Sequence, residues 1–250
     1  MENRPVINLG GRSPAPGADA EVFQRFLKWQ TEVYSPMLLK ASEIVGVDHY
    51  QIVKENPEYP ARVALYHYKN LIYWKTAEGT PENSAIVQEQ RSWVARGIVD
   101  YIWAEAYALT KSFRSKQYPS GGNENTIIEN APIMHLEAYR LSPEEQGKYV
   151  KWFNEYGCTV FMPLFMKVPG LIGYDQYEDT GLKRAGREYM EELEYPKYLS
   201  IIYFENLNAF EDFEKSPELA GFQKVMRSVL PRRLKYEWYV QYQLVGSLRK

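Results

Sequence analysis

Three histidines and one glutamate are the residues of this sequence best suited to proton transfer. The histidines are His49, His67 and His135, and Glu105 lies in an otherwise aromatic segment. A histidine titrates near neutral pH, and a carboxylate among apolar rings has a raised pKa, so both suit general acid–base catalysis. We predict His67 as the general base, with Glu105 or His49 orienting it or acting as the acid. The alternatives are hydrogen-bonded histidines within a sheet and, for Glu105, a salt bridge or exposure near a strand end.

Aromatic side chains are the second notable feature, because the chain has 21 Tyr, 6 Trp and 10 Phe. A tyrosine combines an apolar ring with a polar tip, so such residues can line a cavity for an aromatic or polycyclic molecule. They can equally fill a core or an interface. We predict a pocket lined by Tyr and Trp, mainly in the first half of the chain. The predicted ligand-binding residues are Tyr66, Tyr68, Tyr101, Trp103, Tyr107 and His135.

Composition argues against several other classes of function. The net charge is −2, which provides no basic field for nucleic acid. No apolar run approaches the ~20 residues of a membrane span, and the first residues lack the apolar core of a signal peptide. The single cysteine, Cys158, excludes an intrachain disulfide and is expected to be a buried thiol. We therefore expect a cytoplasmic protein whose partner is a small molecule, with no nucleic acid and no membrane.

Cofactor and metal signatures are also missing from the sequence. The three histidines show none of the spacings of common metal sites, and Gly121-Gly122 does not lie between a strand and a helix as a phosphate-binding loop would. No Gly-x-Ser-x-Gly motif is present, which argues against a serine hydrolase. We expect neither a metal nor a cofactor.

The chain contains an internal duplication. Pro5–Leu9 aligns with Pro132–Leu136, and with the same spacing Pro36–Lys40 aligns with Pro163–Lys167. After two changes of length, the blocks that follow keep their order. A repeat of this length is a small domain rather than a solenoid unit. We predict a first repeat at 1–116, a polar linker at 117–130 and a second repeat at 131–250.

Each repeat is predicted to contain four strands and two helices. Apolar residues recur at helical spacing after the first strand, and Pro36 and Pro163 mark a kink or an end of that helix. Two aromatic strands and a Pro-initiated helix follow, and a last strand is expected to place Val99, Tyr101, Trp103, Glu105 and Tyr107 on one face. A short surface helix is predicted over 182–193.

The order strand, helix, strand, strand, helix, strand is the ferredoxin-like βαββαβ unit. One such unit has helices on one face of its sheet only, so its bare face must be covered. The predicted fold class is therefore α+β, with two tandem ferredoxin-like repeats packed sheet to sheet as an intrachain dimeric α/β-barrel. The fused pair could associate further.

Short motifs give this pattern a resemblance to the dimeric α/β-barrel superfamily, in particular its EthD-like branch. They are Tyr34–Leu38, Phe161–Phe165, Val168–Leu171 with Tyr174, Phe204–Asn206 and Ser216–Glu218. Where that family often has a histidine before a Pro-Leu step, this chain has Tyr34 and Phe161, so any catalytic role of that histidine is lost here.

The resemblance implies several kinds of activity. The superfamily includes cofactor-free monooxygenases, polyketide cyclases, lactone isomerases and haem proteins. It thus implies metal-free acid–base chemistry of the cyclase, isomerase or monooxygenase type on a largely apolar or aromatic molecule. The alternatives are a non-catalytic ligand-binding or assembly protein, and a haem-binding enzyme with His67 or His135 as ligand.

The duplication also provides an internal comparison. Positions that are alike in both repeats are expected to be structural, whereas a titratable group gained by one repeat is a functional candidate. The four such pairs are His67 with Tyr203, His49 with Gln176, Glu105 with Val240, and His135 with Asn8. Whether His49 and His67 share a sheet face depends on the strand register, which the sequence leaves open.

Overall fold

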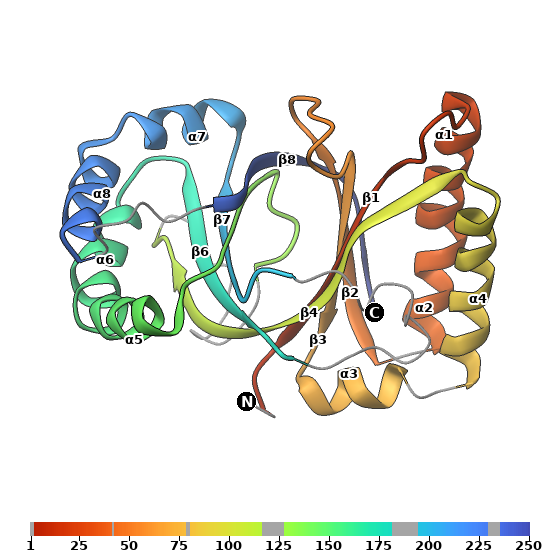
Figure 1. Ribbon diagram of the computed structural model, residues 1–250, viewed down its shortest axis with the longest axis horizontal. Coiled ribbons are helices and arrows are strands. Elements are labelled where there is room, and N and C mark those ends of the chain that lie inside the picture. The colour runs from red at the N-terminus through yellow and green to blue at the C-terminus, as the bar shows by residue number, and fades with distance from the viewer. Residues whose placement is uncertain (1–2, 42, 79–80, 117–127, 182–194, 230–235) are drawn as a thin grey trace. The chain divides into compact units, whose positions relative to one another are not determined.

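The computed structural model describes the chain except for residues 1–2, 42, 79–80, 117–127, 182–194 and 230–235 (Figure 1). The elements of the first repeat are β1 (Val6–Pro14), α1 (Ala20–Trp29), the π-helical η1 (Gln30–Tyr34), α2 (Ser35–Ala41), β2 (Ile44–Ile52), β3 (Arg62–Tyr68), α3 (Leu71–Glu78), α4 (Pro81–Ala95) and β4 (Val99–Arg114). Those of the second are β5 (Ile133–Tyr139), α5 (Pro143–Trp152), the π-helical η2 (Phe153–Phe161), α6 (Met162–Phe165), β6 (Leu171–Asp179), β7 (Tyr198–Phe204), α7 (Leu207–Glu214), α8 (Pro217–Val229) and β8 (Tyr236–Arg249).

The predicted fold class is confirmed. Both repeats follow the βαββαβ order, and each adds a short helix, α3 or α7, after its third strand. The hydrogen-bonded strand order is β1-β3-β2-β8-β5-β7-β6-β4, and this antiparallel order closes on itself as a barrel. None of the described helices is both long and apolar enough to cross a membrane.

The chain divides into two compact units that exchange the ends of their last strands. Unit 1 comprises Met1–Leu109, Asp179–Tyr195 and Tyr242–Lys250, and unit 2 comprises Thr110–Glu178 and Pro196–Gln241. Strand β4 therefore begins in unit 1 and ends in unit 2, and β8 does the reverse. Within unit 1, the helices α1, α2 and α4 lie on one face of the strands, and in unit 2 the helices α5, α6 and α8 do the same (Figure 1).

Capping side chains start helices α5 and α8. Ser142 and Glu145 form a capping box at α5, with a proline in the first turn. Ser216 Oγ accepts a hydrogen bond from Leu219 N at 3.1 Å at the start of α8. Such side-chain oxygens satisfy backbone N–H groups that have no partner inside the helix.

The predicted kink before Pro36 and Pro163 takes the form of π-helical backbone. Pro36 follows the π-helical segment η1, and Pro163 follows η2. A proline has no N–H and its ring clashes with the carbonyl four residues earlier, so the wider π turn accommodates it without ending the helix.

The prediction that Tyr101 and Trp103 lie on one face of β4 is wrong, because a β-bulge interrupts the strand between them. Gly11 pairs with Trp103, but its neighbour Arg12 pairs with Tyr101, so the register shifts by one residue. Tyr101 therefore lies on the opposite face of β4 from Trp103, on the face covered by helices. Periodicity alone could not reveal this extra residue.

Two sequence predictions concern segments that lie wholly or partly outside the described residues. The helix predicted over 182–193 lies outside the described residues, as do residues 117–127 of the predicted linker. Ile128, at the end of that linker, is buried, and its backbone N–H donates to Asp175 Oδ2 at 3.3 Å. The folded part of unit 2 therefore includes residue 128. The repeat boundaries themselves stay a prediction.

Candidate functional site

A cavity of about 130 Å³ lies inside unit 1, between the helical face of α1 and η1 and the sheet. A cavity of about 150 Å³ is large enough for benzene, so this one suits a group of about one ring. The rim residues Thr31, Arg62 and Val245 are partly or fully exposed, which gives the cavity an opening to solvent. Its lining residues are Arg12, Leu27, Gln30, Thr31, His49, Tyr50, Arg62, Val63 and Val245.

Arg12 is a buried cation that has no acidic partner among the residues that the structure describes. Its side chain comes from β1, and the residue is only 2% exposed. Nη2 donates to Tyr66 Oη at 3.0 Å and Nη1 to Gly10 O at 3.3 Å. In the amide orientation that suits both groups, Gln30 Oε1 lies 2.8–3.0 Å from the guanidinium nitrogens. All of these acceptors are neutral, and within the described ranges no carboxylate forms an ion pair with Arg12.

His49 and Arg62 complete the polar floor and rim of the cavity. His49 is 5% exposed, and its Nε2 lies 3.0 Å from Ser35 Oγ at the start of α2. Burial, together with the positive charges of Arg12 and Arg62, lowers the pKa of His49 to about 3 despite the opposing effect of Asp48. The imidazole is therefore neutral at pH 7. Burial also lowers the pKa of Arg62.

Three irregularities of the backbone meet at this cavity. The bulge beside Arg12 places Arg12 opposite Tyr101, whose ring lies 5.2 Å from the guanidinium carbon. A second register shift, between His49 and Tyr50, leaves Val245 of β8 without a partner in β2. The π-helical segment η1 contributes Gln30 and Thr31. Bulges and π turns are frequent next to functional sites because they redirect individual side chains.

The equivalent region of the second repeat is filled by aromatic side chains. Tyr139 and Tyr198 align with Arg12 and Arg62, and their rings stack with centroids 5.7 Å apart. Gly157 aligns with Gln30, and a Cβ there would lie 2.6 Å from the ring of Phe153. The polar cavity and its charges are thus a property of the first repeat.

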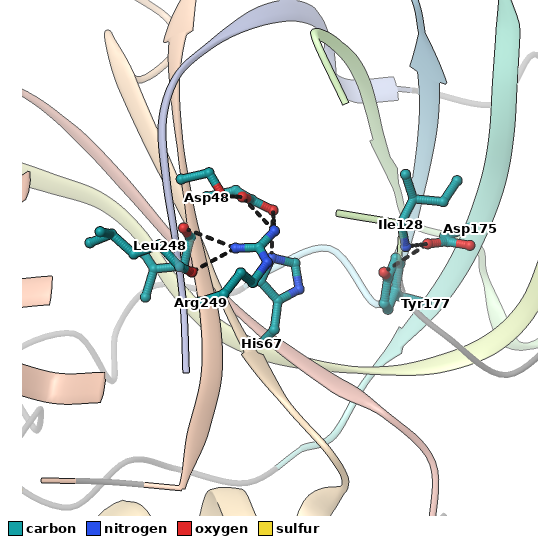
Figure 2. Close-up of polar contacts among 9 residues, drawn as sticks. Asp48, His67, Ile128, Asp175, Tyr177, Leu248 and Arg249 are labelled. Carbon is teal, nitrogen blue, oxygen red and sulfur yellow. Dashed lines mark hydrogen bonds and ion pairs between the residues drawn. The ribbon is translucent and has the colours of Figure 1, made fainter. Parts of the chain in front are cut away.

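His67 lies in a different cluster, on the other face of the sheet (Figure 2). His49 pairs with Ala64 across β2 and β3, and His67 is an odd number of residues from Ala64, so the two histidines face opposite sides. Nε2 of His67 lies 2.8 Å from Asp48 Oδ2, and the two side chains are 1% and 0% exposed. The catalytic role of His67 stays a prediction, but the cavity contains only His49.

Asp48 is the centre of this second cluster. It accepts hydrogen bonds from Ser247 Oγ at 2.6 Å and from Arg249 Nη2 at 2.7 and 2.8 Å, as Figure 2 shows for Arg249. Burial by itself would raise the pKa of Asp48, but the bonds from His67 and Ser247 and the charge of Arg249 outweigh it and hold that pKa well below its ordinary value. The carboxylate is therefore charged, and it anchors β8 to β2.

The second repeat has a matching cluster without a histidine. Asp175 aligns with Asp48, and it accepts from Ser112 Oγ at 2.5 Å and from Arg114 Nη1 at 2.7 Å. It also accepts from Tyr177 Oη at 3.2 Å (Figure 2). Tyr203 takes the position of His67. Because both repeats keep the Asp–Arg–Ser arrangement, we interpret it as a clasp for the last strand rather than as a reaction centre.

The remaining predicted site residues of the first repeat are divided between the two faces of the sheet. Tyr66 and Tyr101 surround Arg12, and Tyr68 is buried in the apolar cluster under α2 and α3. Trp103 and Tyr107 are on the opposite face, where burial raises the pKa of Tyr107 well above its ordinary value. Tyr50 is the aromatic residue among the lining residues of this cavity, beside Arg12, Gln30 and His49. The pocket lined by Tyr and Trp stays a prediction.

Glu105 is not part of the cavity, because it lies on the face of β4 that carries Trp103 and Tyr107. It is half-buried, and its Oε1 accepts from Ala106 N at 2.8 Å. Its role as an acid or base stays a prediction.

His135 lies in unit 2, held on both sides by polar neighbours. Its Nε2 is 3.3 Å from Glu137 Oε1, and its Nδ1 is 2.9 Å from Gln241 Nε2. Its ring packs 5.0 Å from that of Phe210 and 4.4 Å from that of Tyr239. Glu137 and Gln241 therefore orient the imidazole, and ligand binding by His135 stays a prediction.

The haem alternative does not fit the residues that the structure describes. His67 Nε2 is bound to Asp48, and both nitrogens of His135 have partners. The cavity beside His49 holds about one ring, far less than a porphyrin needs. Across the described ranges, no group of three or more His, Cys, Asp or Glu side chains is placed to hold a metal ion.

Comparison with solved structures shows similarity of fold. No family model and no curated protein matches this sequence. A predicted monooxygenase from Fusobacterium nucleatum is 6% identical, with a TM-score of 0.61 over 100% of this chain and 96% of its own. An anthrone oxidase-like protein is 12% identical, with a TM-score of 0.61 over 98% and 92% of the two chains. A mutant chlorite dismutase from Candidatus Nitrospira defluvii is 10% identical, with a TM-score of 0.54 over 98% and 93%.

The chain has the dimeric α/β-barrel fold. The similarity extends over both repeats, so the predicted dimeric α/β-barrel fold is confirmed. At these identities it shows the fold alone, and the EthD-like branch stays a prediction.

Sequence reasoning missed the residues that give the cavity its charge. Arg12 and Arg62 were not among the candidates, although each aligns with a tyrosine of the second repeat. The comparison of the two repeats would have found them if it had included arginine, whose charge is permanent, and not only groups that titrate near neutral pH.

Proposed function

We propose that the first repeat binds a small molecule in the cavity beside Arg12 and that His49 transfers a proton to or from it. The observation that carries the proposal is a solvent-connected cavity where a neutral buried imidazole lies among two cations. A pocket with a few convergent polar groups and a strongly shifted pKa is the usual form of a ligand or active site.

The proposed chemistry is proton abstraction from a carbon next to a carbonyl. Ser35 engages Nε2 of His49, and Nδ1 makes no hydrogen bond among the described residues, so Nδ1 is the proposed proton acceptor. The C–H bond breaks, an N–H bond forms on the imidazole, and the electron pair moves to the carbonyl oxygen as an enolate. Arg12 and Arg62 stabilise that oxyanion electrostatically. The negative charge in turn raises the pKa of His49, which makes it a better base when the ligand is bound.

Two bulky substitutions test the binding part of this proposal. Thr31→Phe places a ring at the rim of the cavity, whereas Val33→Phe adds the same ring to an exposed position of the same helical segment. A fragment library of one-ring acids, amides and ketones is screened by ligand-observed NMR. We expect hits on the wild type and on Val33→Phe that disappear on Thr31→Phe. Hits that persist with Thr31→Phe would place binding elsewhere.

Solvent deuterium incorporation tests the chemistry. A bound fragment with a C–H next to a carbonyl should exchange that hydrogen in D2O, and the exchange should be lost in His49→Gln, which introduces the residue found at the equivalent position Gln176. Unchanged exchange in His49→Gln would remove His49 as the base, and binding without any exchange in the wild type would leave a binding protein.

A further inference from the structure

The charge of the cavity carries an inference about the class of its ligand, which rests on the proposed function. Arg12 and Arg62 both line the cavity, and its lining includes no acidic residue from the described part of the chain. Within the described ranges neither arginine forms an ion pair, whereas Arg114 and Arg249 each have a carboxylate within 2.7 Å. The arginines of the strand clasps are therefore neutralised, and those of the cavity are not.

An uncompensated buried guanidinium is costly, because water is replaced by neutral groups that solvate a charge only in part. The chain keeps Arg12 at 2% exposure with Tyr66, Gly10 and Gln30 as its neighbours. These groups hold the guanidinium in place without cancelling its charge. His49 adds no negative charge, since it is neutral at pH 7.

The geometry points to an organic anion, a one-ring carboxylate, as the ligand of this cavity. Its carboxylate pairs with Arg12 at the floor and Arg62 at the rim, and its ring packs against Leu27, Val63 and Val245. A carboxylate matches the fork of donors that a guanidinium presents, and a charged hydrogen bond is about twice as strong as a neutral one. The second repeat, with stacked Tyr139 and Tyr198 at the two arginine positions, does not take such a ligand.

Benzoate and benzamide are two probes that distinguish the effect of ligand charge from that of ligand shape. The two molecules have nearly the same size, and only benzoate carries a charge at pH 7. We expect benzoate to bind the wild type at least about tenfold more tightly than benzamide, as measured by ligand-observed NMR titration at fixed ionic strength. Arg12→Met should abolish this preference, so that benzoate and benzamide bind with similar affinity. Arg25→Met, which deletes the charge of an exposed arginine on α1, should leave it intact.

Each outcome bears on one of the two proposals. Equal affinity for benzoate and benzamide, abolished by Thr31→Phe, would overturn the anion and leave the binding cavity standing. Failure of both probes to bind would overturn the cavity as a site for one-ring ligands. Full benzoate affinity in Arg12→Met would overturn the assignment of the charge to Arg12. If Arg12→Met does not fold, Arg62→Met at the half-buried rim is the second variant, with a smaller loss of the same ratio expected.

Discussion

Arg249 donates from Nη2 to both carboxylate oxygens of Asp48, at 2.7 and 2.8 Å. Asp48 is fully buried on β2, and Arg249 lies on β8. The pair therefore joins strands that are far apart in the sequence, and Ser247 and His67 satisfy the same carboxylate from two further directions.

Asp48→Asn should destabilise the protein strongly. The substitution removes the negative charge and leaves Arg249 and His67 without their partner, and breaking a buried ion pair on one side costs about 3–5 kcal/mol. Urea unfolding followed by circular dichroism measures the change. Asp100→Asn, at an exposed position of β4, should change the free energy of unfolding by less than about 0.5 kcal/mol. Equal small effects of both variants would mean that the clasp contributes little.

His49 should make the free energy of unfolding depend on pH in the mildly acidic range. Its pKa is about 3 in the folded chain against 6.5 for the ordinary side chain, so the unfolded state binds the proton first as the pH falls. The free energy of unfolding contributed by this group is complete above pH 6.5 and is lost as the pH falls toward 3, by up to about 1.4 kcal/mol per pH unit.

His49→Gln should flatten that dependence between about pH 6.5 and 4.5, where carboxylates such as Asp48 are still charged in both states. Thermal unfolding at a series of pH values measures it for both proteins. A wild type and a variant whose profiles run parallel would show that His49 is not held neutral by burial and by the charges of Arg12 and Arg62.

Arg12→Met should stabilise the ligand-free protein. Methionine fills a similar volume without the cost of a buried charge, and replacement of buried ionic groups by apolar ones is often neutral or stabilising by about 1 kcal/mol or more. Benzoate should raise the melting temperature of the wild type only, because binding to the native state alone stabilises it. A loss of several kcal/mol in Arg12→Met would instead identify Arg12 as a structural residue.

Two glycine-to-alanine substitutions should change the free energy of unfolding in opposite directions. A Cβ on Gly11 would lie 2.6 Å from Pro60 Cγ and 3.1 Å from Trp103 Cβ, so Gly11→Ala should cost about 1–3 kcal/mol. Gly147 is exposed on α5 with nothing within 4 Å of such a Cβ, so Gly147→Ala should stabilise the helix by about 0.5–1 kcal/mol. Chemical denaturation measures both, and equal signs would contradict the packing described around the bulge.

The duplication, the order of helices and strands along the chain and the helix starts were predictable because they depend on local patterns. The capping box at Ser142 and the π-helical kinks before Pro36 and Pro163 arise from residues close in sequence. The same patterns occur twice, so each repeat supported the interpretation of the other.

The site was harder to predict because its geometry depends on register. One extra residue beside Arg12 moves Tyr101 to the other face of β4, and the pairing of His49 with Ala64 separates His49 from His67. Arginine on a strand is ordinarily a surface residue, and only the packing of Gln30 and Tyr66 around Arg12 shows that it is buried.

The exchange of strand ends between the units has a consequence for any attempt to divide the chain. A fragment that stops after the first repeat would lack Tyr242–Lys250, so the edge of β2 would be open and Asp48 would lose its contacts with Ser247 and Arg249. Its counterpart would lack Thr110–Arg114, which supplies Ser112 and Arg114 to Asp175. Each piece would carry the missing part of the other, so the two would behave as complementing fragments that regain their structure only on mixing.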